Sequence, residues 1–317
     1  MSHFKKLKRY AKDPWWALSW DLIQKHPKLM SNKWFLSTKF RYVFGRPINW
    51  KNPTTFSEKL QWLKVYDRNP LYTTLVDKYR VKEYVTKLIG EEFVFPLYKV
   101  YEKADDINFD ELPNQFVLKC NNDSGSLIIC RDKLNGEMFL GKSDDKVHLS
   151  ILEARNILDS GLKRNFYNEH HEWAYKDVKP CIIAEKYMEC KTSERKDLFD
   201  YKFWCFNGEP KYIWLGTNYT PSYFDIYSTD WVNQHVEYGH SNAPQDAERP
   251  PKLDEMLDIA RKLSKGIPHV RVDLYEIDGR IYFGEYTFYT WAGLEPFIPN
   301  SFDKVMGDCL VLPTKKS

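Results

Sequence analysis

A predicted β-hairpin near the end of the chain constrains this protein more than any other stretch. Its first strand alternates polar and apolar side chains, and Asp278-Gly279 supplies the turn, because glycine tolerates positive φ. Successive side chains of a strand point to opposite faces, so one face is apolar and the other polar. The apolar face holds Val270, Val272 and Leu274, and the polar face holds Arg271, Asp273 and Tyr275.

The length of the turn decides which side chains meet across this hairpin. With a three-residue loop at 278–280, Asp273 lies opposite Glu285 and Arg271 lies opposite Thr287. Facing carboxylates repel unless a cation lies between them, and Mg²⁺ held by carboxylates and substrate phosphates is such a cation. A two-residue loop, which Asp-Gly also favours, is expected to put the two acids on opposite faces. A solvated face with scattered charges explains the same residues without any ligand.

Length and composition indicate a globular protein with more than one lobe. The chain has 317 residues, of which 43% are hydrophobic, and this exceeds what one core usually supports. Its mean hydropathy is −0.60, no apolar run approaches a membrane span, and no secretory signal is visible. The six cysteines are scattered without metal-binding or redox spacing, which is typical of a reducing compartment, so we expect a cytoplasmic protein.

The first 51 residues carry most of the positive charge. They hold twelve Lys and Arg against two Asp and Glu, a balance of +10, whereas the remainder is at −7. This segment is also rich in aromatic residues: Trp15, Trp16, Trp20, Trp34, Phe35, Phe40, Tyr42 and Phe44. Such a segment is either a helical subdomain with buried aromatics or a surface for an anionic membrane or glycan. Nucleic acid is not expected as a partner, because the remainder has no basic bias.

The rest of the pattern predicts helices and hairpins that segregate along the chain. Residues 1–50 are predicted to form short helices broken at Pro14, Pro27 and Pro47. A further helix is predicted to start near Thr55 or Ser57, and three more are predicted at 74–89, 147–160 and 253–263. Strands are predicted at 94–97, 116–121, 127–130, 181–188, 200–206 and 211–214. Because these elements do not alternate as βαβ units, the fold class is α+β.

The known nucleotide-binding loops are missing, but another phosphate cradle is present. There is no GxxxxGKS and no GxGxxG after a strand. Lys119 ends a predicted strand, and Ser124-Gly125-Ser126 forms a flexible tip whose backbone N–H groups can close over phosphates. Lys78 and Lys202 are further cations in apolar surroundings, although a lysine also reaches solvent readily. No histidine has zinc spacing, and Ser124 is not in a GxSxG elbow.

A series of ordered motifs from about Asn52 to Phe302 resembles one enzyme family. The motifs are Phe56-Ser-Glu-Lys-Leu-Gln-Trp-Leu-Lys, Leu75-Val-Asp-Lys78-Tyr, Leu112-Pro-Asn-Gln-Phe-Val-Leu-Lys119-Cys-Asn, Ile183-Ala-Glu185-Lys186-Tyr, Asp200-Tyr-Lys202-Phe, Asn207-Gly-Glu-Pro-Lys, Val270-Arg271-Val-Asp273-Leu-Tyr and Gly284-Glu285-x-Thr287-Phe. Together they resemble the teichuronopeptide-biosynthesis (TupA-like) branch of the ATP-grasp enzymes. Its members are similar to carboxylate–amine ligases and occur in bacterial capsule, O-antigen and cell-wall polysaccharide pathways.

The resemblance implies a role for each matching residue. Lys78 and Lys119 would hold ATP phosphates beneath a mobile flap made of Asn122, Ser124, Gly125 and Ser126. Glu185, Lys186 and Tyr187 would line the adenine slot, with Glu189 also counted among the nucleotide-binding residues. Lys202 would meet the γ-phosphate, and Arg271 would steady the charge that develops at the acyl phosphate. Asp273, Glu285 and Thr287 would form the Mg²⁺ site.

The chain departs from the family pattern at three positions. Thr287 stands where the family usually has an asparagine as second-metal ligand. Asn122 stands where histidine or glycine is common. The turn after the last strand reads Thr290-Trp291-Ala292-Gly293 instead of a proline- and serine-bearing turn, which implies an unusual acceptor pocket.

The resemblance implies an ATP-grasp fold whose two α+β lobes hold ATP between them. We expect a basic helical segment at 1–55, a helical and α/β part at 56–110, a small lobe with the flap at 111–190 and a large lobe with the metal and acceptor sites at 191–317. The expected activity is ATP- and Mg²⁺-dependent joining of a carboxylate to an amine in surface polysaccharide synthesis. The expected partners are small-molecule or glycan acids and amines, with peripheral contact to the inner membrane or to polysaccharide assembly enzymes. The alternatives are a glycosyltransferase and a non-catalytic nucleotide- or glycan-binding protein.

Overall fold

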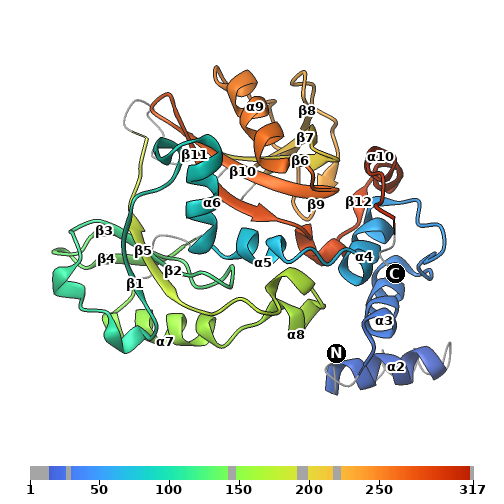
Figure 1. The fold of residues 1–317 in the computed structure, drawn as a ribbon, viewed down its shortest axis with the longest axis horizontal. Coiled ribbons are helices and arrows are strands. Elements are labelled where there is room, and N and C mark those ends of the chain that lie inside the picture. Colours follow the sequence, from blue (N-terminus) through green and yellow to red (C-terminus); the bar gives the residue numbers. More distant parts are fainter. Residues whose placement is uncertain (1–13, 26–29, 142–147, 191–198, 217–222, 315–317) are drawn as a thin grey trace.

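The fold is built on two five-stranded antiparallel sheets with helices packed against them, and β9 (Glu237–Tyr238) and β12 (Phe297–Ile298) form a further two-stranded sheet (Figure 1). The structure, a computed structural model, describes residues 14–25, 30–141, 148–190, 199–216 and 223–314. Each five-stranded sheet has its own hydrophobic core, which confirms the α+β class and the expectation of more than one lobe. No helix in these described ranges combines the length and the apolar character that a membrane crossing requires.

The first sheet is built from the middle of the chain. Its strand order is β1 (Leu97–Tyr101), β5 (Ile182–Lys186), β2 (Phe116–Cys120), β3 (Ile128–Asp132) and β4 (Glu137–Leu140). Strand β2 alternates buried and half-buried side chains, and helix α7 (Ile151–Leu162) packs against it through Ala154 and Leu158, both fully buried. The opposite face of β2 carries Val117 and Lys119 and is left for polar groups.

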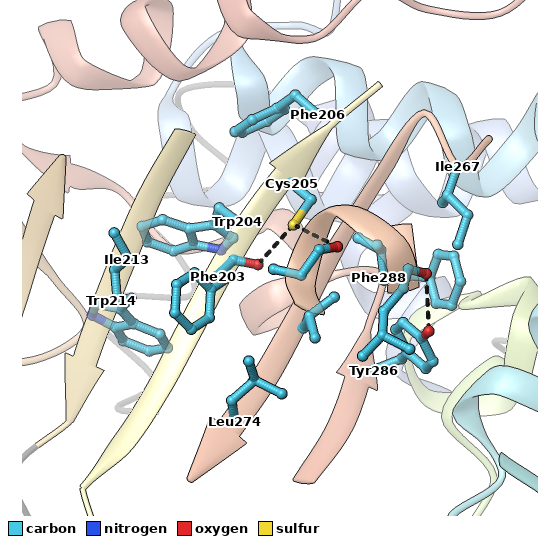
Figure 2. Packing of buried hydrophobic residues seen from close by; sticks show 14 of the residues in the cluster. Phe203, Trp204, Cys205, Phe206, Ile213, Trp214, Ile267, Leu274, Tyr286 and Phe288 are labelled. Atoms are coloured by element: carbon cyan, nitrogen blue, oxygen red, sulfur yellow. Dashed lines mark hydrogen bonds between the residues drawn. The ribbon is translucent and has the colours of Figure 1, made fainter. Parts of the chain in front are cut away.

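The second sheet contains the predicted C-terminal hairpin. Its order is β11 (Arg280–Thr287), β10 (His269–Ile277), β6 (Asp200–Phe206), β7 (Glu209–Gly216) and β8 (Phe224–Ser228). Helix α9 (Leu253–Ser264) packs against β6, β7 and β10. Every residue of β6 is buried, and Figure 2 shows Trp204 stacked on Trp214 of the next strand, with ring centroids 5.6 Å apart. The predicted hairpin around Asn207-Gly208 is confirmed.

The helices that follow residue 55 pack on the core of the second sheet. They are α4 (Phe56–Tyr66), α5 (Leu71–Val76) and α6 (Arg80–Ile89), and α10 (Ser301–Cys309) packs against α4. Thr55 caps α4, and Glu58 reaches back to complete a capping box, as the sequence predicts. The structure divides the predicted 56–110 part between the lobes, because these helices join the second core whereas β1 joins the first sheet.

Two predicted elements differ from the structure. The single helix predicted at 74–89 is wrong, because Asp77 accepts hydrogen bonds from the N–H groups of Tyr79 (2.9 Å) and Arg80 (3.2 Å) and starts a new helix there. The break places Lys78 between α5 and α6. The strand predicted at 94–97 is also wrong: a 3₁₀ turn, Glu91–Phe93, precedes a strand that begins at Leu97.

The N-terminal helices lie at one end of the molecule, away from both sheets (Figure 1). They are α2 (Pro14–Lys25) and α3 (Asn32–Phe44). The predicted breaks at Pro14 and Pro47 flank them, and Pro27 lies outside the described residues. Phe35 and Phe40 are buried, but Trp34 and Tyr42 are more than two-fifths exposed. The aromatic residues therefore serve partly as a small core and partly as surface.

Candidate active site

The hairpin of β10 and β11 pairs the two predicted metal ligands. Asp273 lies opposite Glu285, and Arg271 lies opposite Thr287, as the three-residue loop predicted. The loop itself has only two residues, however, because Ile277 pairs with Arg280. The predicted pairing of Asp273 with Glu285 is therefore confirmed, but the predicted three-residue loop is wrong.

A β-bulge at Gly284 restores the register that the short turn alone would have lost. Leu274 pairs with Phe283 and Asp273 pairs with Glu285, so Gly284 is an extra residue on β11. A Cβ on Gly284 would lie 2.8 Å from a ring carbon of Tyr275 and 3.2 Å from the carbonyl oxygen of Asp273, so the backbone approach here requires glycine. The bulge brings Glu285 to the same face as Asp273.

Arg271 and Lys202 hold the carboxylate of Asp273 from two strands. The guanidinium of Arg271 donates from Nε to Oδ1 and from Nη2 to Oδ2, each at 2.7 Å. Lys202 on β6 donates from Nζ to Oδ2 of Asp273 at 2.8 Å and to Asp200. Asp273 is 1% exposed, so these charged groups are almost fully removed from water.

Glu285 and Thr287 lie at the more open edge of this cluster. Nη2 of Arg271 donates to Oγ1 of Thr287 at 2.9 Å and reaches Oε1 of Glu285 at 3.5 Å. The hydroxyl of Thr287 is 3.4 Å from the same oxygen of Glu285. The side chain of Glu285 is 34% exposed, and this exposure leaves it accessible to a ligand.

The charges of the cluster stabilise one another. Burial acts to lower the pKa of Lys202, but the carboxylates of Asp200 and Asp273 outweigh it and raise the pKa above its usual value. Burial also opposes the charge of Arg271, and Asp273 and Glu285 raise its pKa in turn. Both side chains are therefore cations throughout the physiological pH range.

Lys78 connects this cluster to the first sheet. Its ammonium group lies 3.4 Å from Oε2 of Glu285 and donates to the carbonyl oxygen of Asp123 at 2.7 Å. Its backbone N–H donates to the carbonyl of Asn121 at 3.2 Å. The break between α5 and α6 thus places a lysine between the loop after β2 and the acids of the second sheet.

Lys119 lies on the polar face of the first sheet with Glu185. Its Nζ is 2.7 Å from Oε2 of Glu185, and Lys82 on α6 pairs with the other carboxylate oxygen. Burial acts to raise the pKa of Glu185, but the two lysines outweigh it and hold that pKa below its usual range. Lys119 and Glu185, predicted at the phosphates and the adenine, are brought together here as an ion pair.

The loop after β2 is anchored at both ends. Asn122 donates to the carbonyl oxygens of Gly161 (3.1 Å) and Arg164 (2.8 Å), and the hydroxyl of Ser126 donates to Asp123 at 2.6 Å. Of the loop residues 121–127, only Ser124 and Gly125 are exposed. The structure thus confines the exposed part of the predicted flap to its tip, and it turns the amide of Asn122 toward the end of α7.

The remaining predicted nucleotide-binding residues follow β5. Lys186 ends that strand and is exposed, and its backbone N–H donates to the carbonyl of Pro96 at 2.9 Å. Tyr187 and Glu189 are half-buried in the segment that follows. Their contact with adenine stays a prediction.

The sequence did not predict two charged residues that pair with the candidate site residues: Asp200, which pairs with Lys202, and Lys82, which pairs with Glu185. Asp200 is two positions before Lys202 on one strand, so it shares a face with Lys202 and the spacing could have revealed it. Nothing in the sequence distinguishes Lys82 from an ordinary surface lysine on a predicted helix.

The donor set fits a magnesium ion that also binds phosphate. Among the described residues no group of three or more His, Cys, Asp or Glu side chains can hold a metal by itself. Asp273 and Glu285 nevertheless face each other, and Mg²⁺ commonly binds one or two carboxylates and takes its other ligands from phosphates and water. The nearby cations, Lys78, Lys202 and Arg271, can neutralise the negative charges of a polyphosphate.

The family model of the TupA-like ATP-grasp proteins matches residues 58–311 of this chain. A search of curated proteins finds no significant relative.

Solved structures give distant matches. D-alanine–D-alanine ligase from Bacillus anthracis, complexed with ATP, is 18% identical with a TM-score of 0.36, and the match covers 68% of this chain and 54% of that one. The corresponding ligase from Helicobacter pylori is 13% identical with a TM-score of 0.37, covering 75% and 61%. The L-amino acid ligase from Bacillus licheniformis is 13% identical with a TM-score of 0.39, covering 84% and 56%. This chain therefore spans little more than half the length of these proteins.

Proposed function

The chain belongs to the TupA-like ATP-grasp family, and from that membership we propose that it is an ATP-dependent ligase. It activates a carboxylate as an acyl phosphate and joins the acyl group to an amine. The acid is a uronic acid or an amino acid of a bacterial surface polysaccharide, and the enzyme works in the cytoplasm.

The observation that supports this proposal best is the pairing of Asp273 with Glu285 among three cations. Lys78, Lys202 and Arg271 all lie within 4 Å of one or both acids. Phosphoryl transfer needs charge neutralisation and positioning more than covalent chemistry, and a cluster of this composition supplies both. When bound by the two acids, Mg²⁺ neutralises charge on the transferring phosphoryl group.

The chain's own residues position the reacting groups. Lys78 and Lys119 come from different elements and bind phosphate oxygens between the lobes. Lys202 and Arg271 are held in place by their buried partners, so their charges need no rearrangement when the phosphoryl group moves.

Binding of Mg·ATP tests the first step of the proposal. At about a hundred times its Kd, a ligand that binds only the folded state adds about 2.7 kcal/mol to the free energy of unfolding. We expect Mg·ATP to raise the melting temperature of the protein. We also expect that ADP is released only when both an acid and an amine are present. If a nucleotide sugar raises the melting temperature and Mg·ATP does not, the glycosyltransferase alternative is favoured.

We also propose that the N-terminal helices bind an anionic membrane surface. The segment 1–51 has a charge balance of +10, and the described part of α2 and α3 exposes both apolar and basic side chains. The exposed residues are Leu18, Trp34 and Tyr42 among the apolar ones and Lys25, Lys33 and Arg41 among the basic ones. This combination suits the interface of an anionic lipid bilayer.

Cosedimentation with lipid vesicles checks this attachment. We expect binding to vesicles that contain phosphatidylglycerol, no binding to pure phosphatidylcholine, and strong weakening with salt, because exposed charges are screened. Each basic residue at such a surface contributes about 1 kcal/mol, so reversing Lys25, Lys33 and Arg41 to glutamate should reduce partitioning at least about a hundredfold. If the unmodified protein does not bind at low salt, the aromatic residues serve packing alone.

A further inference from the structure

A second group of buried charges lies beside the cluster on the hairpin. Lys64 on α4 is 0% exposed, and its Nζ donates to the carbonyl oxygens of Ala292 (2.8 Å) and His170 (3.1 Å). Lys39 on α3 donates to the carbonyl of Glu169 at 3.0 Å. Glu172, which follows α8 (Phe166–His170), is 7% exposed and lies among these groups.

The carboxylate of Glu172 has no partner of its own. Within the described residues no side chain or backbone group donates a hydrogen bond to it, and no cation lies within 4 Å. Nδ1 of His170 is also buried without a partner. A buried carboxylate normally has a partner, because removing its charge from water is costly. The carboxylate oxygens of Glu172 are not wholly enclosed in the way that Nδ1 of His170 is, so a small ligand with N–H donors can reach them.

The surrounding contacts hold Glu172 in place. The ring of the preceding residue, His171, stacks on the ring of Phe35 with their centroids 3.9 Å apart, and Nδ1 of His171 is 2.9 Å from Oδ1 of Asn32. The carbonyl of Glu172 accepts from the N–H of Tyr175 at 3.1 Å. The backbone is thus fixed on both sides of Glu172.

Tyr175 links Glu172 to the hairpin cluster. Burial raises the pKa of Tyr175, and the charges of Glu172 and of Glu285 raise it further, so its phenol lies within electrostatic reach of both acids. The segment 290–292 gives a second link: Nη1 of Arg271 donates to the hydroxyl oxygen of Thr290 at 3.4 Å, and Nζ of Lys64 donates to the carbonyl oxygen of Ala292. Glu172 is therefore connected to the hairpin cluster through Tyr175 and through the segment 290–292.

We propose that Glu172 binds the amine of the acceptor substrate and takes its proton. This inference rests on the proposed ligase function and assigns the amine site within it. An ammonium group supplies the hydrogen bonds and the positive charge that the carboxylate lacks. Lys64 and Lys39 lie nearby without neutralising it, and their charges favour the uncharged, nucleophilic form of the bound amine.

The proton balance of the step is simple. The carboxylate of Glu172 takes one proton from the ammonium group, leaving a neutral amine and a carboxylic acid. The nitrogen lone pair forms the C–N bond at the acyl carbon, and the C–O bond to the phosphate breaks with its electrons on the leaving phosphate. The second nitrogen proton goes to that phosphate, so the products are an amide and hydrogen phosphate.

The ionisation of Glu172 suits this role. Burial raises its pKa to about 7, although Lys64 and Lys39 act in the opposite direction, and Glu169 adds to the rise. The other titratable groups that interact with it are Tyr175 and Tyr289. A base with a pKa near the working pH exchanges protons most effectively.

Replacing Glu172 with glutamine tests the unsatisfied carboxylate without any knowledge of the acid substrate. The raised pKa means that ionising Glu172 costs stability as the pH rises through about 7, and an amide avoids that cost. We expect Glu172→Gln to melt a few degrees above the unmodified protein at about pH 8.5 and to show a smaller difference at about pH 5. The control is Glu169→Gln, because Glu169 has an ion partner, Arg164, at 2.9 Å and should gain nothing.

Binding of a simple amine tests the site directly. Methylammonium chloride should raise the melting temperature of the unmodified protein and of Glu169→Gln, but not that of Glu172→Gln. Tetramethylammonium chloride, which has no N–H donor, should have no such effect. If Glu172→Gln destabilises the protein at both pH values, or if methylammonium acts equally on both variants, the carboxylate is structural and the proposal is overturned.

Kinetics with an acid and amine pair found by ADP release separates this inference from the ligase proposal. A hydrogen bond to a charged group contributes about 1.5–3 kcal/mol, so Glu172→Gln should raise the amine KM about ten- to a hundredfold. The loss should be larger for protonated primary amines than for hydroxylamine, which is neutral at the assay pH. Equal losses for both amines overturn the role of Glu172, whereas no ADP from the unmodified protein with any acid overturns the ligase function itself.

Discussion

Replacing Glu285 with glutamine is expected to reduce turnover by about a hundred- to a thousandfold while leaving the fold intact. The carboxylate is 34% exposed, and its contacts to Lys78 and Arg271 are long, at 3.4 and 3.5 Å, so the folded state depends on it little. Mg²⁺ depends on it strongly, because an amide keeps the shape and loses the charge that holds the ion. Initial rates of ADP release and thermal unfolding measure the two effects.

The matched control is Glu276→Gln on the neighbouring strand. Glu276 is also half-buried but lies three residues beyond Asp273, near the turn, and it has no contact with the cluster. Turnover should be unchanged in this variant. Full activity of Glu285→Gln with normal Mg²⁺ dependence would contradict the assignment of the metal site.

Asp273→Asn is a less clean test than Glu285→Gln. Asp273 is 1% exposed and accepts from both Arg271 and Lys202. An asparagine would leave two buried cations with a weaker partner, so stability should fall together with activity. The sequence alone gave no reason to separate the two acids, because burial depends on the sheets that pack around them.

The hairpin illustrates what alternation can and cannot predict. The apolar face of β10 could be predicted because Val270, Val272 and Leu274 repeat with the period of a strand. The bulge could have been inferred from Gly284, since an isolated glycine within a strand often marks one. Its effect on the register could not, because only the pairing with β10 shows how the extra residue is accommodated.

The helical region shows a different limit. Asp77 breaks the predicted helix through a hydrogen bond from its side chain to the backbone, and its carboxylate also accepts from Asn121 at 2.8 Å. That partner is 44 residues away. A local pattern of apolar residues contains no information about such a contact, and the position of Lys78 depends on it.

Glu172 and Lys64 were not predicted for a related reason. A lysine in a helix and a glutamate in a polar stretch are usually solvated, and composition supports that interpretation. Their burial follows from the packing of α3, α4 and α8 against one another, through contacts such as that of Lys64 with His170. Only the three-dimensional structure reveals that their charges are buried.

Replacing Lys202 with methionine is expected to lower the free energy of unfolding by about 3–5 kcal/mol. Lys202 is 6% exposed, and its ammonium group lies between Asp200 and Asp273. Methionine fills a similar volume but leaves the two carboxylates with one cation fewer, and an uncompensated buried charge is costly. Urea unfolding of the purified variant measures the loss.

The double variant Lys202→Met/Asp200→Asn distinguishes this electrostatic cause from a packing defect. Removing one of the two acids restores the charge balance, so it should recover part of the lost stability. Lys78→Met is the matched control, because Lys78 is partly exposed and its ion pair with Glu285 is 3.4 Å long. That variant should lose ATP-dependent activity with a much smaller loss of stability. If Lys202→Met is as stable as the unmodified protein and only its activity falls, Lys202 serves the γ-phosphate alone and the buried carboxylates are compensated by Arg271.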